Sequence, residues 1–414
     1  MEPLLENLTV DETFFEPARR LIRHYCRHRR DTPVLDDERF VCEVLRRVLG
    51  GWDSGRDFLQ ARQDDGEDLA RGTWFDGHHS RRWVDLVAEV ATRSYELFDR
   101  FLQPRDWLKE FPELAGWAVW AVDGHQIEHA SHAARDRKDR LVSVGTLYGL
   151  CLHSGLMRSL APFQGDGVQR HEWPVFKQHL PGWLARDHGK LLPIVVGDPA
   201  YIDVLFWFDQ KRRRQSVIIT REKENMIPLI IGPNPFDSLD PVNRGVEADE
   251  LAGYTHAHMR RIVYCDPLSG ERFVFLTTET TLRPGVIALL YFLRWKIEKV
   301  FDVSKNKLHQ QKAWANVDTA TQLQAHAIAL THNLLTLLLA NLEQAGIREV
   351  KIERKQAARR KAWPAARRVP AQEMVRHAAQ LSCQFIRLVR HYLHRRTSWP
   401  DALPRFRLRL EAYL

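Results

Sequence analysis

The sequence is poor in cysteine. Its 414 residues include five, spread along the chain without a C-x-x-C pair: Cys26, Cys42, Cys151, Cys265 and Cys383. This spacing argues against a disulfide framework and against a zinc knuckle. Unpaired cysteines are typical of a reducing compartment, so we expect the protein to work in the cytoplasm.

A long uninterrupted apolar run is also missing, although 44% of the residues are hydrophobic and can form a sizeable core. The longest run, AIALTHNLLTLLLANL at residues 327–342, contains the polar residues Thr331, His332 and Asn333. We therefore expect a helix of the protein core here rather than a membrane span. The first residues, MEPLLENLTVDETFF, are acidic and lack the basic and apolar segments of a signal peptide.

Positive charge is unevenly distributed along the chain. The formal net charge is +8, from 61 Lys and Arg against 53 Asp and Glu. Residues 351–414 hold sixteen of the basic and four of the acidic residues, a net charge of +12, which leaves −4 for residues 1–350. Such a basic block usually faces a polyanion, because each neutralised phosphate releases condensed counterions. Nucleic acid is thus the expected partner, with a solvated Arg-rich surface as the alternative.

The order of segments predicts an α/β protein. Residues 1 to about 110 have apolar residues at helical spacing. Short apolar runs rich in β-formers follow and alternate with a helical stretch. We divide the chain into a helical N-terminal region that is a candidate for DNA-end binding, a core in two parts with a β-rich insertion between them, and a basic helical C-terminal region. In chain order these are residues 1–112, 113–220, 221–282, 283–345 and 346–414, the insertion being the third.

The stretch LYFLRWKIEKVFDVSKNKL, residues 290–308, predicts one helix with a narrow polar stripe. On a helical wheel five side chains fall within about 80°: Tyr291, Arg294, Glu298, Asp302 and Lys305. Apolar residues take most of the remaining arc, so the helix should be largely buried. An ion pair of Arg294 with Glu298 is one explanation, but Glu298 and Asp302 remain unfavourable i,i+4 neighbours. A bound cation or a phosphate explains the stripe better.

Two aspartates follow short apolar runs upstream. Asp123 follows WAVWAV, where Asp123 and Gly124 also suit a two-residue hairpin turn. Asp198 follows LLPIVVG, where it also suits a helix cap with Pro199 in the first helical position. Carboxylates at strand ends of an α/β sheet lie where ligands bind. If they converge with Glu298, the three carboxylates would offer oxygen ligands to Mg²⁺ or Mn²⁺, and two such ions would promote phosphodiester displacement.

The signature residues carry a resemblance to a known family. The Y-x2-R-x3-E-x6-K pattern of DDE transposases from bacterial insertion sequences is matched here by Tyr291, Arg294, Glu298 and Lys305. The flanking pattern of that family, RW.IE..F, appears in this sequence as RWKIEKVF. The segments VDG and VVGDPAY, which contain the two aspartates, resemble the aspartate motifs of that family. The resemblance covers about residues 115–340.

This resemblance implies an RNase-H-like catalytic core with a metal-binding triad of Asp123, Asp198 and Glu298. It implies two Mg²⁺ ions per active site, for which Mn²⁺ would substitute. Tyr291, Arg294 and Lys305 would contact DNA near the scissile phosphate. The partners would be double-stranded DNA, at terminal inverted repeats and at the target, and a second copy of the chain in a homodimer on paired ends. The expected location is the bacterial nucleoid.

Several other segments are candidates for binding. His125, His129 and His132 lack the spacing of a zinc motif, although His125 lies beside Asp123. The basic run at residues 211–214 either binds DNA or ends a helix favourably. Residues 357–368, AARRKAWPAARR, are the best candidate for non-specific DNA binding. The candidates for stacking on a flipped base are Trp207, Trp295 and Trp314.

Two alternative functions stay open at the level of sequence. A nuclease of the same fold would hydrolyse DNA without strand transfer. A domesticated DNA-binding protein would have lost catalysis, and the intact triad and signature argue against it.

Overall fold

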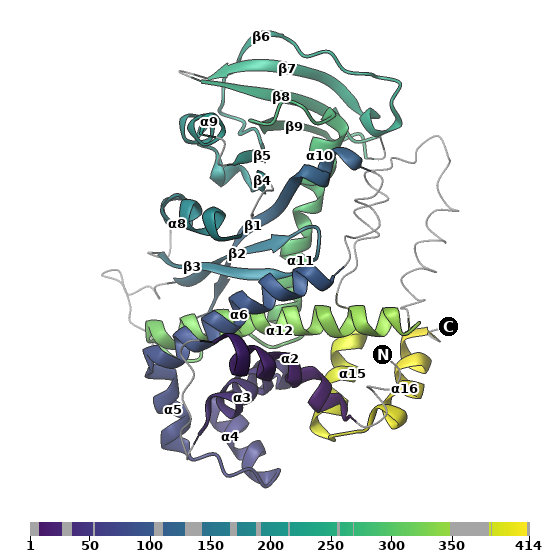
Figure 1. Ribbon diagram of the computed structural model, residues 1–414. Coiled ribbons are helices and arrows are strands. Elements are labelled where there is room, and N and C mark those ends of the chain that lie inside the picture. The colour runs from purple at the N-terminus through teal and green to yellow at the C-terminus, as the bar shows by residue number, and fades with distance from the viewer. Residues whose placement is uncertain are drawn as a thin grey trace.

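The computed structural model describes residues 8–26, 35–52, 54–102, 111–128, 143–165, 172–187, 192–213, 216–254, 257–267, 269–347, 381 and 383–411. A twisted sheet with helices on both faces forms the upper part in Figure 1, and a body of helices lies below it. The α/β class predicted from the sequence is confirmed by this arrangement.

Nine strands of the described chain form one sheet. They are β1 (Trp117–Ile127), β2 (Ser143–Cys151), β3 (Met157–Gly165), β4 (Leu192–Val196), β5 (Val217–Arg221), β6 (Leu229–Pro233), β7 (Val246–Tyr254), β8 (Ala257–Cys265) and β9 (Arg272–Thr277). Their order is β3-β2-β1-β4-β5-β9-β8-β7-β6. β4 lies parallel to β1 and β5, and every other neighbouring pair is antiparallel. The strands of the β-rich insertion therefore extend the core sheet, because β9 pairs with β5.

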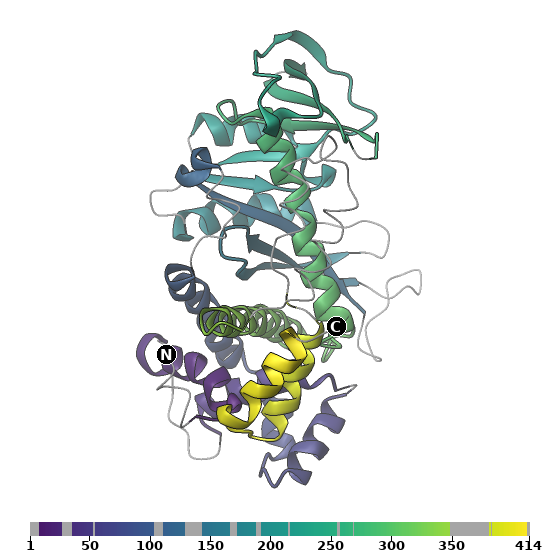
Figure 2. The same cartoon turned by 90° about the vertical axis from the view of Figure 1, so that its right-hand side faces the viewer.

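Helices of the described chain lie on both faces of the sheet. α8 (Glu172–Asp187) and α9 (Val204–Arg212) lie on one face, and α10 (Pro284–Leu293) and α11 (Trp295–Asn306) on the other. Short 3₁₀ turns occur at η1 (Pro112–Gly116), η2 (Pro199–Tyr201) and η3 (Pro241–Asn243). In Figure 2, α10 and α11 form nearly one rod that runs along the sheet toward the helical body.

The helical body is made of segments from both ends of the sequence. It contains α2 (Val10–Tyr25), α3 (Asp37–Gly50), α4 (Gly55–Asp64), α5 (Arg71–His79), α6 (Arg81–Phe101), α12 (Asp318–Gln344), α15 (Cys383–His394) and α16 (Trp399–Glu411). Side-chain caps from Thr9, Asp36 and Ser54 fix the starts of α2, α3 and α4. The helical character predicted for residues 1 to about 110 is confirmed for the part of this region that the structure describes, residues 8–26, 35–52 and 54–102.

α12 is the core helix predicted for the long apolar run. By length and composition it could cross a membrane, but 83% of its most apolar window is buried inside the protein. Two of the polar residues that interrupt the run, His332 and Asn333, make internal hydrogen bonds. Asn333 bonds to the backbone N–H and carbonyl of Met157 at 2.7 and 3.0 Å and to Ser94 Oγ at 3.0 Å. His332 Nε2 lies 2.9 Å from the carbonyl of Gly155. These bonds attach α12 to the sheet and to α6.

The two ends of the described chain meet in the helical body. The N–H of Val10 donates to the carbonyl of Thr397 at 2.9 Å, and the N–H of Trp399 donates to the carbonyl of Leu8 at 3.2 Å. The indole of Trp399 is fully buried and donates to Thr13 Oγ1 at 2.6 Å. The C-terminal helices thus complete the body that the N-terminal helices begin.

Candidate active site

The sequence had suggested that Asp123 ends a strand. In the structure it lies within β1 instead. β1 pairs with β4 as far as Ala121 and then continues along β2, where Asp123 lies opposite Tyr148. The hairpin turn considered for Asp123 and Gly124 is therefore wrong, because β2 supplies partners to the end of the strand. The Asp123 carboxylate nevertheless lies just past the end of the parallel neighbour β4, where ligands bind in α/β sheets.

Asp198 follows β4 directly and caps η2. Its Oδ1 accepts the N–H of Ala200 at 2.9 Å, and Pro199 is the first residue of the turn. The capping role considered for Asp198 is confirmed, although the longer helix α9 begins later with Asp203 as its cap. The carbonyl of Asp198 accepts the hydroxyl of Thr220 on β5 at 2.9 Å, which fixes the Asp198 backbone beside the neighbouring strand.

The signature segment is two helices joined at Arg294, not the single helix that was predicted. The N–H of Arg294 donates to the carbonyl of Tyr291, and the N–H of Ile297 donates to the carbonyl of Arg294, both at 3.0 Å. These i to i+3 bonds tighten one turn to 3₁₀ geometry. The predicted burial is correct for α10 but wrong for α11, which exposes Trp295 and Lys299.

Arg294 joins two of the three predicted triad residues. Its Nη1 lies 3.4 Å from Oδ2 of Asp123, and its Nη2 lies 2.7 Å from Oε1 of Glu298. The side chains of Arg294 and Asp123 are 9% and 19% exposed, and that of Glu298 is 37% exposed. The guanidinium therefore lies between a strand carboxylate and a helix carboxylate, at the edge of the buried core.

The third predicted triad residue, Asp198, acts on the same place through its charge. Burial raises the pKa of Asp123 to about 6, and the guanidinium of Arg294 opposes this rise. The negative charges of Asp198 and Glu298 add to the increase in the pKa of Asp123. Crowded carboxylates resist ionisation unless a cation lies among them. The three carboxylates therefore share one electrostatic environment.

Tyr291 and Arg221 lie at the border of this cluster. Burial raises the pKa of Tyr291, the positive charges of Arg294 and Arg221 lower it, and the charge of Asp198 raises it. Arg221, the last residue of β5, was not among the candidates identified from the sequence. Arg221 is exposed and makes no ion pair within the described part of the chain. A basic residue at the carboxyl end of the strand beside β4 is the pattern that would have identified it.

Lys305 faces β1 near His125. Burial and, to a smaller extent, the positive charge of Lys305 together lower the pKa of His125 to about 3. The His125 ring packs against Phe301 with ring centroids 4.7 Å apart. The other two histidines considered for zinc, His129 and His132, lie outside the described residues. The contacts of His125 indicate a lining residue of the core rather than a zinc ligand.

The carboxylate cluster fits a divalent metal in donor type and charge. Carboxylate oxygens are the ligands that Mg²⁺ and Mn²⁺ prefer. Across the residues that the structure describes, no three His, Cys, Asp or Glu side chains lie close enough together to hold an ion. The Arg294 guanidinium supplies the positive charge between Asp123 and Glu298 instead. Arg294 thus stands in for a cation at this place.

Asp302 lies on the predicted polar stripe but outside the cluster. It is exposed, and its Oδ1 accepts the side-chain amide of Asn306 at 2.6 Å. The unfavourable pairing with Glu298 inferred from the helical wheel is therefore relieved by a local hydrogen bond and by the attraction of Glu298 to Arg294.

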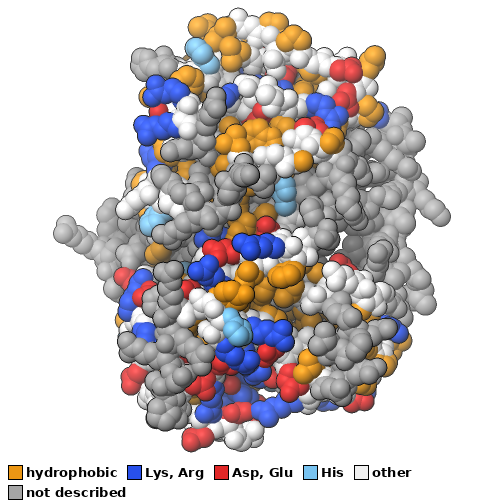
Figure 3. Space-filling model, viewed as in Figure 1, with side chains coloured by type: hydrophobic (Ala, Val, Ile, Leu, Met, Phe, Trp, Pro, Cys, Tyr) orange, Lys and Arg blue, Asp and Glu red, His pale blue; other side chains and the backbone are white. Residues whose placement is uncertain are grey.

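The remaining sequence candidates differ in exposure. Trp207 is fully buried in the core, whereas Trp295 is 54% exposed. Trp314 stacks under the guanidinium of Arg47 at 4.1 Å. The basic run at residues 211–214 lies at the end of α9, where Arg212 and Arg213 form ion pairs with Asp209. Residue 214 and the basic segment 357–368 lie outside the described residues. Figure 3 shows that basic and acidic side chains are interspersed over the helical body.

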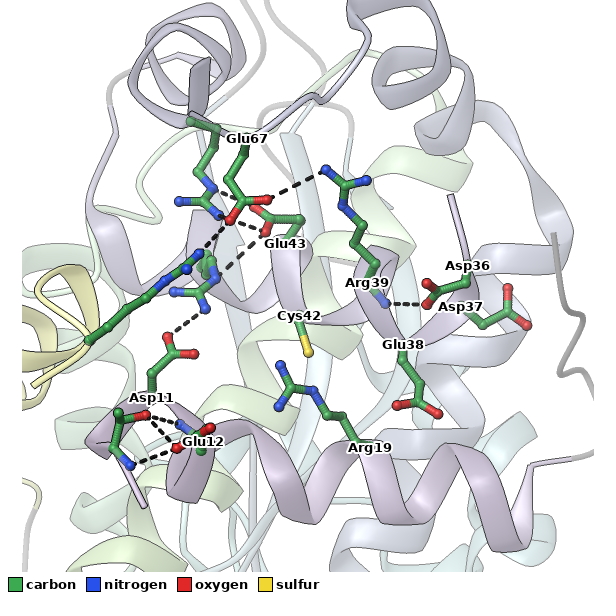
Figure 4. Close-up of a pocket in the computed structure, with 14 residues that line it drawn as sticks. Asp11, Glu12, Arg19, Asp36, Asp37, Glu38, Arg39, Cys42, Glu43 and Glu67 are labelled. Carbon is green, nitrogen blue, oxygen red and sulfur yellow. Dashed lines mark hydrogen bonds and ion pairs between the residues drawn. The ribbon is translucent and has the colours of Figure 1, made fainter. Parts of the chain in front are cut away.

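A cavity of about 710 Å³ lies in the helical body, and its walls carry seven carboxylates and five guanidiniums (Figure 4). Most of these charges are paired within the wall. Arg62 bonds to Glu43 at 2.8 Å, and Arg46 to Asp11 at 2.5 Å. The carboxylates outnumber the guanidiniums, so this cavity is not suited to the phosphates of DNA.

Comparison with known families agrees with the geometry of the site. No curated protein matches the chain. Residues 119–334, just over half of the chain, match the model of the family described as transposase DDE domain. The matched region runs from β1 to α12 and contains all residues of the predicted triad and signature. Membership of this family implies that the sheet described above is an RNase-H-like core. The chain belongs to the transposase DDE domain family.

Proposed function

We propose that this protein cleaves the ends of an insertion sequence and joins them to target DNA. A transposase-type function, a DNA substrate and the use of divalent metal ions follow from membership of the family. The single observation that carries the proposal is the cluster at Arg294, where the carboxylates of Asp123 and Glu298 share one guanidinium and Asp198 adds its charge. Such a concentration of carboxylates is favourable only when cations balance it.

In this proposal Asp123, Asp198 and Glu298 would hold two Mg²⁺ ions, for which Mn²⁺ would substitute. Bound ions of this kind lower the pKa of the attacking water or hydroxyl and stabilise the leaving oxygen. Arg294 then binds a phosphate of the DNA with its planar fork, and Lys305 contributes a point charge. Tyr291, which is buried at the border of the cluster, donates a hydrogen bond from its hydroxyl to a phosphate of the DNA. Arg221 is a further phosphate contact at the exposed side.

Two displacements at phosphorus complete the proposed reaction. In the first, the oxygen of water forms a bond to phosphorus and the bond to the 3′ oxygen breaks, which leaves a 3′ hydroxyl on the element. In the second, that 3′ oxygen attacks a phosphorus of the target strand and displaces the 3′ oxygen there. The same carboxylates serve both steps, because each step exchanges one oxygen for another on phosphorus.

We further propose that the protein acts as a homodimer on paired ends. The core in residues 113–220 and 283–345, with its insertion, would carry the chemistry. The flanking regions 1–112 and 346–414 would bind DNA, and the basic charge of the second supports this.

A matched pair of substitutions on α11 tests the catalytic assignment. Glu298→Gln should abolish cleavage of DNA that carries the flanking inverted repeats in Mg²⁺ while DNA binding persists, because the variant loses a metal-binding charge but keeps its shape. Asp302→Asn removes the same charge one turn away, where the side chain of Asp302 accepts a hydrogen bond from Asn306, and should cleave normally. Normal cleavage by Glu298→Gln would refute the assignment. Cleavage by the wild-type protein without joined products would favour the alternative nuclease.

A further inference from the structure

The guanidinium of Arg294 lies at the place where a cation shared by Asp123 and Glu298 would bind. Its two terminal nitrogens contact Oδ2 of Asp123 at 3.4 Å and Oε1 of Glu298 at 2.7 Å. A divalent ion held by both carboxylates would use the same oxygens. Because the guanidinium and the ion are both positive and need the same small space, they compete for it.

Arg294 also has an unused hydrogen-bond donor. Arg294 as a whole is 7% exposed. Its Nε is buried and donates no hydrogen bond within the described part of the chain. A guanidinium presents its N–H groups as a planar fork, which matches the oxygens of a phosphate. The ring centroid of Tyr291 lies 5.7 Å from the guanidinium carbon of Arg294, and the charge of Arg221 acts on the same tyrosine. The guanidinium would therefore gain acceptors by moving from the carboxylates to a phosphate group.

We infer that Arg294 is a switch that couples metal binding to DNA binding. In the DNA-free protein its guanidinium closes the metal site by pairing with Asp123 and Glu298. When DNA binds, a phosphate takes the guanidinium and the carboxylates become available to the ions. The inference rests on the proposed function, since it concerns the regulation of the same site. Coupling of this kind is reciprocal, so the metal ion and the DNA strengthen each other's binding by the same factor.

The first test measures metal affinity without DNA. Isothermal titration of the full-length protein with MnCl₂ should give at least about fivefold tighter binding for Arg294→Gln than for the wild type, a typical size for linked sites. Lys299→Gln is the matched control, because it removes a positive charge from the exposed face of α11 without touching the carboxylates. It should bind Mn²⁺ as the wild type does. If Arg294→Gln binds Mn²⁺ no tighter than Lys299→Gln does, the switch is refuted.

Double variants separate this result from the proposed function itself. In the Arg294→Gln background, Asp123→Asn or Glu298→Gln should remove Mn²⁺ binding. If binding persists, these carboxylates are not the metal ligands and the proposed function fails, whatever Arg294 does. If neither the wild type nor Arg294→Gln binds Mn²⁺, both proposals fail. Circular dichroism tests whether each variant folds. If Arg294→Gln does not fold, Arg294→Lys takes its place, because lysine keeps the positive charge but cannot bridge two carboxylates.

The second test measures DNA affinity without metal. In EDTA, Glu298→Gln frees Arg294 from one carboxylate, so a fluorescently labelled duplex should bind this variant more tightly than the wild type. Asp302→Asn removes an equal charge from the same helix without contacting Arg294 and reports the general electrostatic effect. A gain for Glu298→Gln larger than that for Asp302→Asn supports the switch, and equal gains contradict it.

Discussion

Replacement of Asp123 by Asn should stabilise the metal-free protein above about pH 6. Burial raises the pKa of Asp123 from its ordinary value of 3.8 to about 6, and the charges of Asp198 and Glu298 add to this rise against the attraction of Arg294. The folded protein therefore holds this proton more tightly than the unfolded chain does. The stability that results is fully present below about pH 4 and is lost as the pH rises through about 6.

The size of the effect follows from the two pKa values of Asp123. The difference between about 6 and 3.8 corresponds to about 3 kcal/mol, at roughly 1.36 kcal/mol per pH unit. The side chain of Asp123 is 19% exposed, so solvent screens this effect only weakly. The wild type should lose up to about 3 kcal/mol of unfolding free energy between about pH 4 and pH 7, and Asp123→Asn should not.

Urea denaturation in EDTA at several pH values measures this difference directly. The midpoint of the wild type should fall as the pH rises, and the midpoint of Asp123→Asn should change less. Asp302→Asn should follow the wild type, because Asp302 is exposed on α11 and lies outside the cluster. If Asp123→Asn lost stability with pH as steeply as the wild type, the carboxylates would not be crowded, and the proposed metal site would lose its physical basis.

Two further predictions concern the core and the tail. Asn333→Ala should cost about 3–5 kcal/mol of unfolding free energy, because it takes this partner from the buried N–H and carbonyl of Met157, at about 1–3 kcal/mol each, and removes the bond to Ser94, whose hydroxyl still donates to the carbonyl of Ala91. Urea midpoints should show this loss, whereas Asn341→Ala near the end of α12 should cost far less, and equal losses would contradict the reasoning. Replacing the five basic residues of segment 357–368 by Gln should weaken DNA binding and reduce its salt dependence, by up to about 0.9 in the logarithmic slope for each phosphate that the segment no longer neutralises. A salt slope unchanged in a binding titration would show that the segment faces something other than DNA.

The sequence predicted the elements of the site better than their connections. Periodicity placed the strands before Asp123 and Asp198 correctly, because buried runs of β-formers depend on local preferences. It could not predict that β1 continues past Asp123, because the partners of those residues come from β2, which follows later in the chain. The break at Arg294 was also missed, since a 3₁₀ turn with helical backbone angles leaves no mark in the residue pattern.

The position of Arg294 between two carboxylates could be predicted only in part. The spacing of Arg294 and Glu298 indicated an ion pair, and this pair is present. The contact with Asp123 depends on how α11 packs against β1, which is a tertiary property. For the same reason Arg221 escaped notice, because its proximity to the cluster arises from the order of strands across the sheet.

The meeting of the chain ends in the helical body has a consequence for how the protein is made. α2 is synthesised before the other helices and strands described here, but the backbone bonds of Val10 and Trp399 join residues from the two ends of the described chain. Strands β1 to β3 join sequence neighbours and can pair as soon as they emerge, since contacts between nearby residues form first. During translation the sheet can therefore begin to form before the helical body is complete. Premature termination before α15 leaves α2 without these partners, so the helical body is complete only after α15 and α16 have been synthesised.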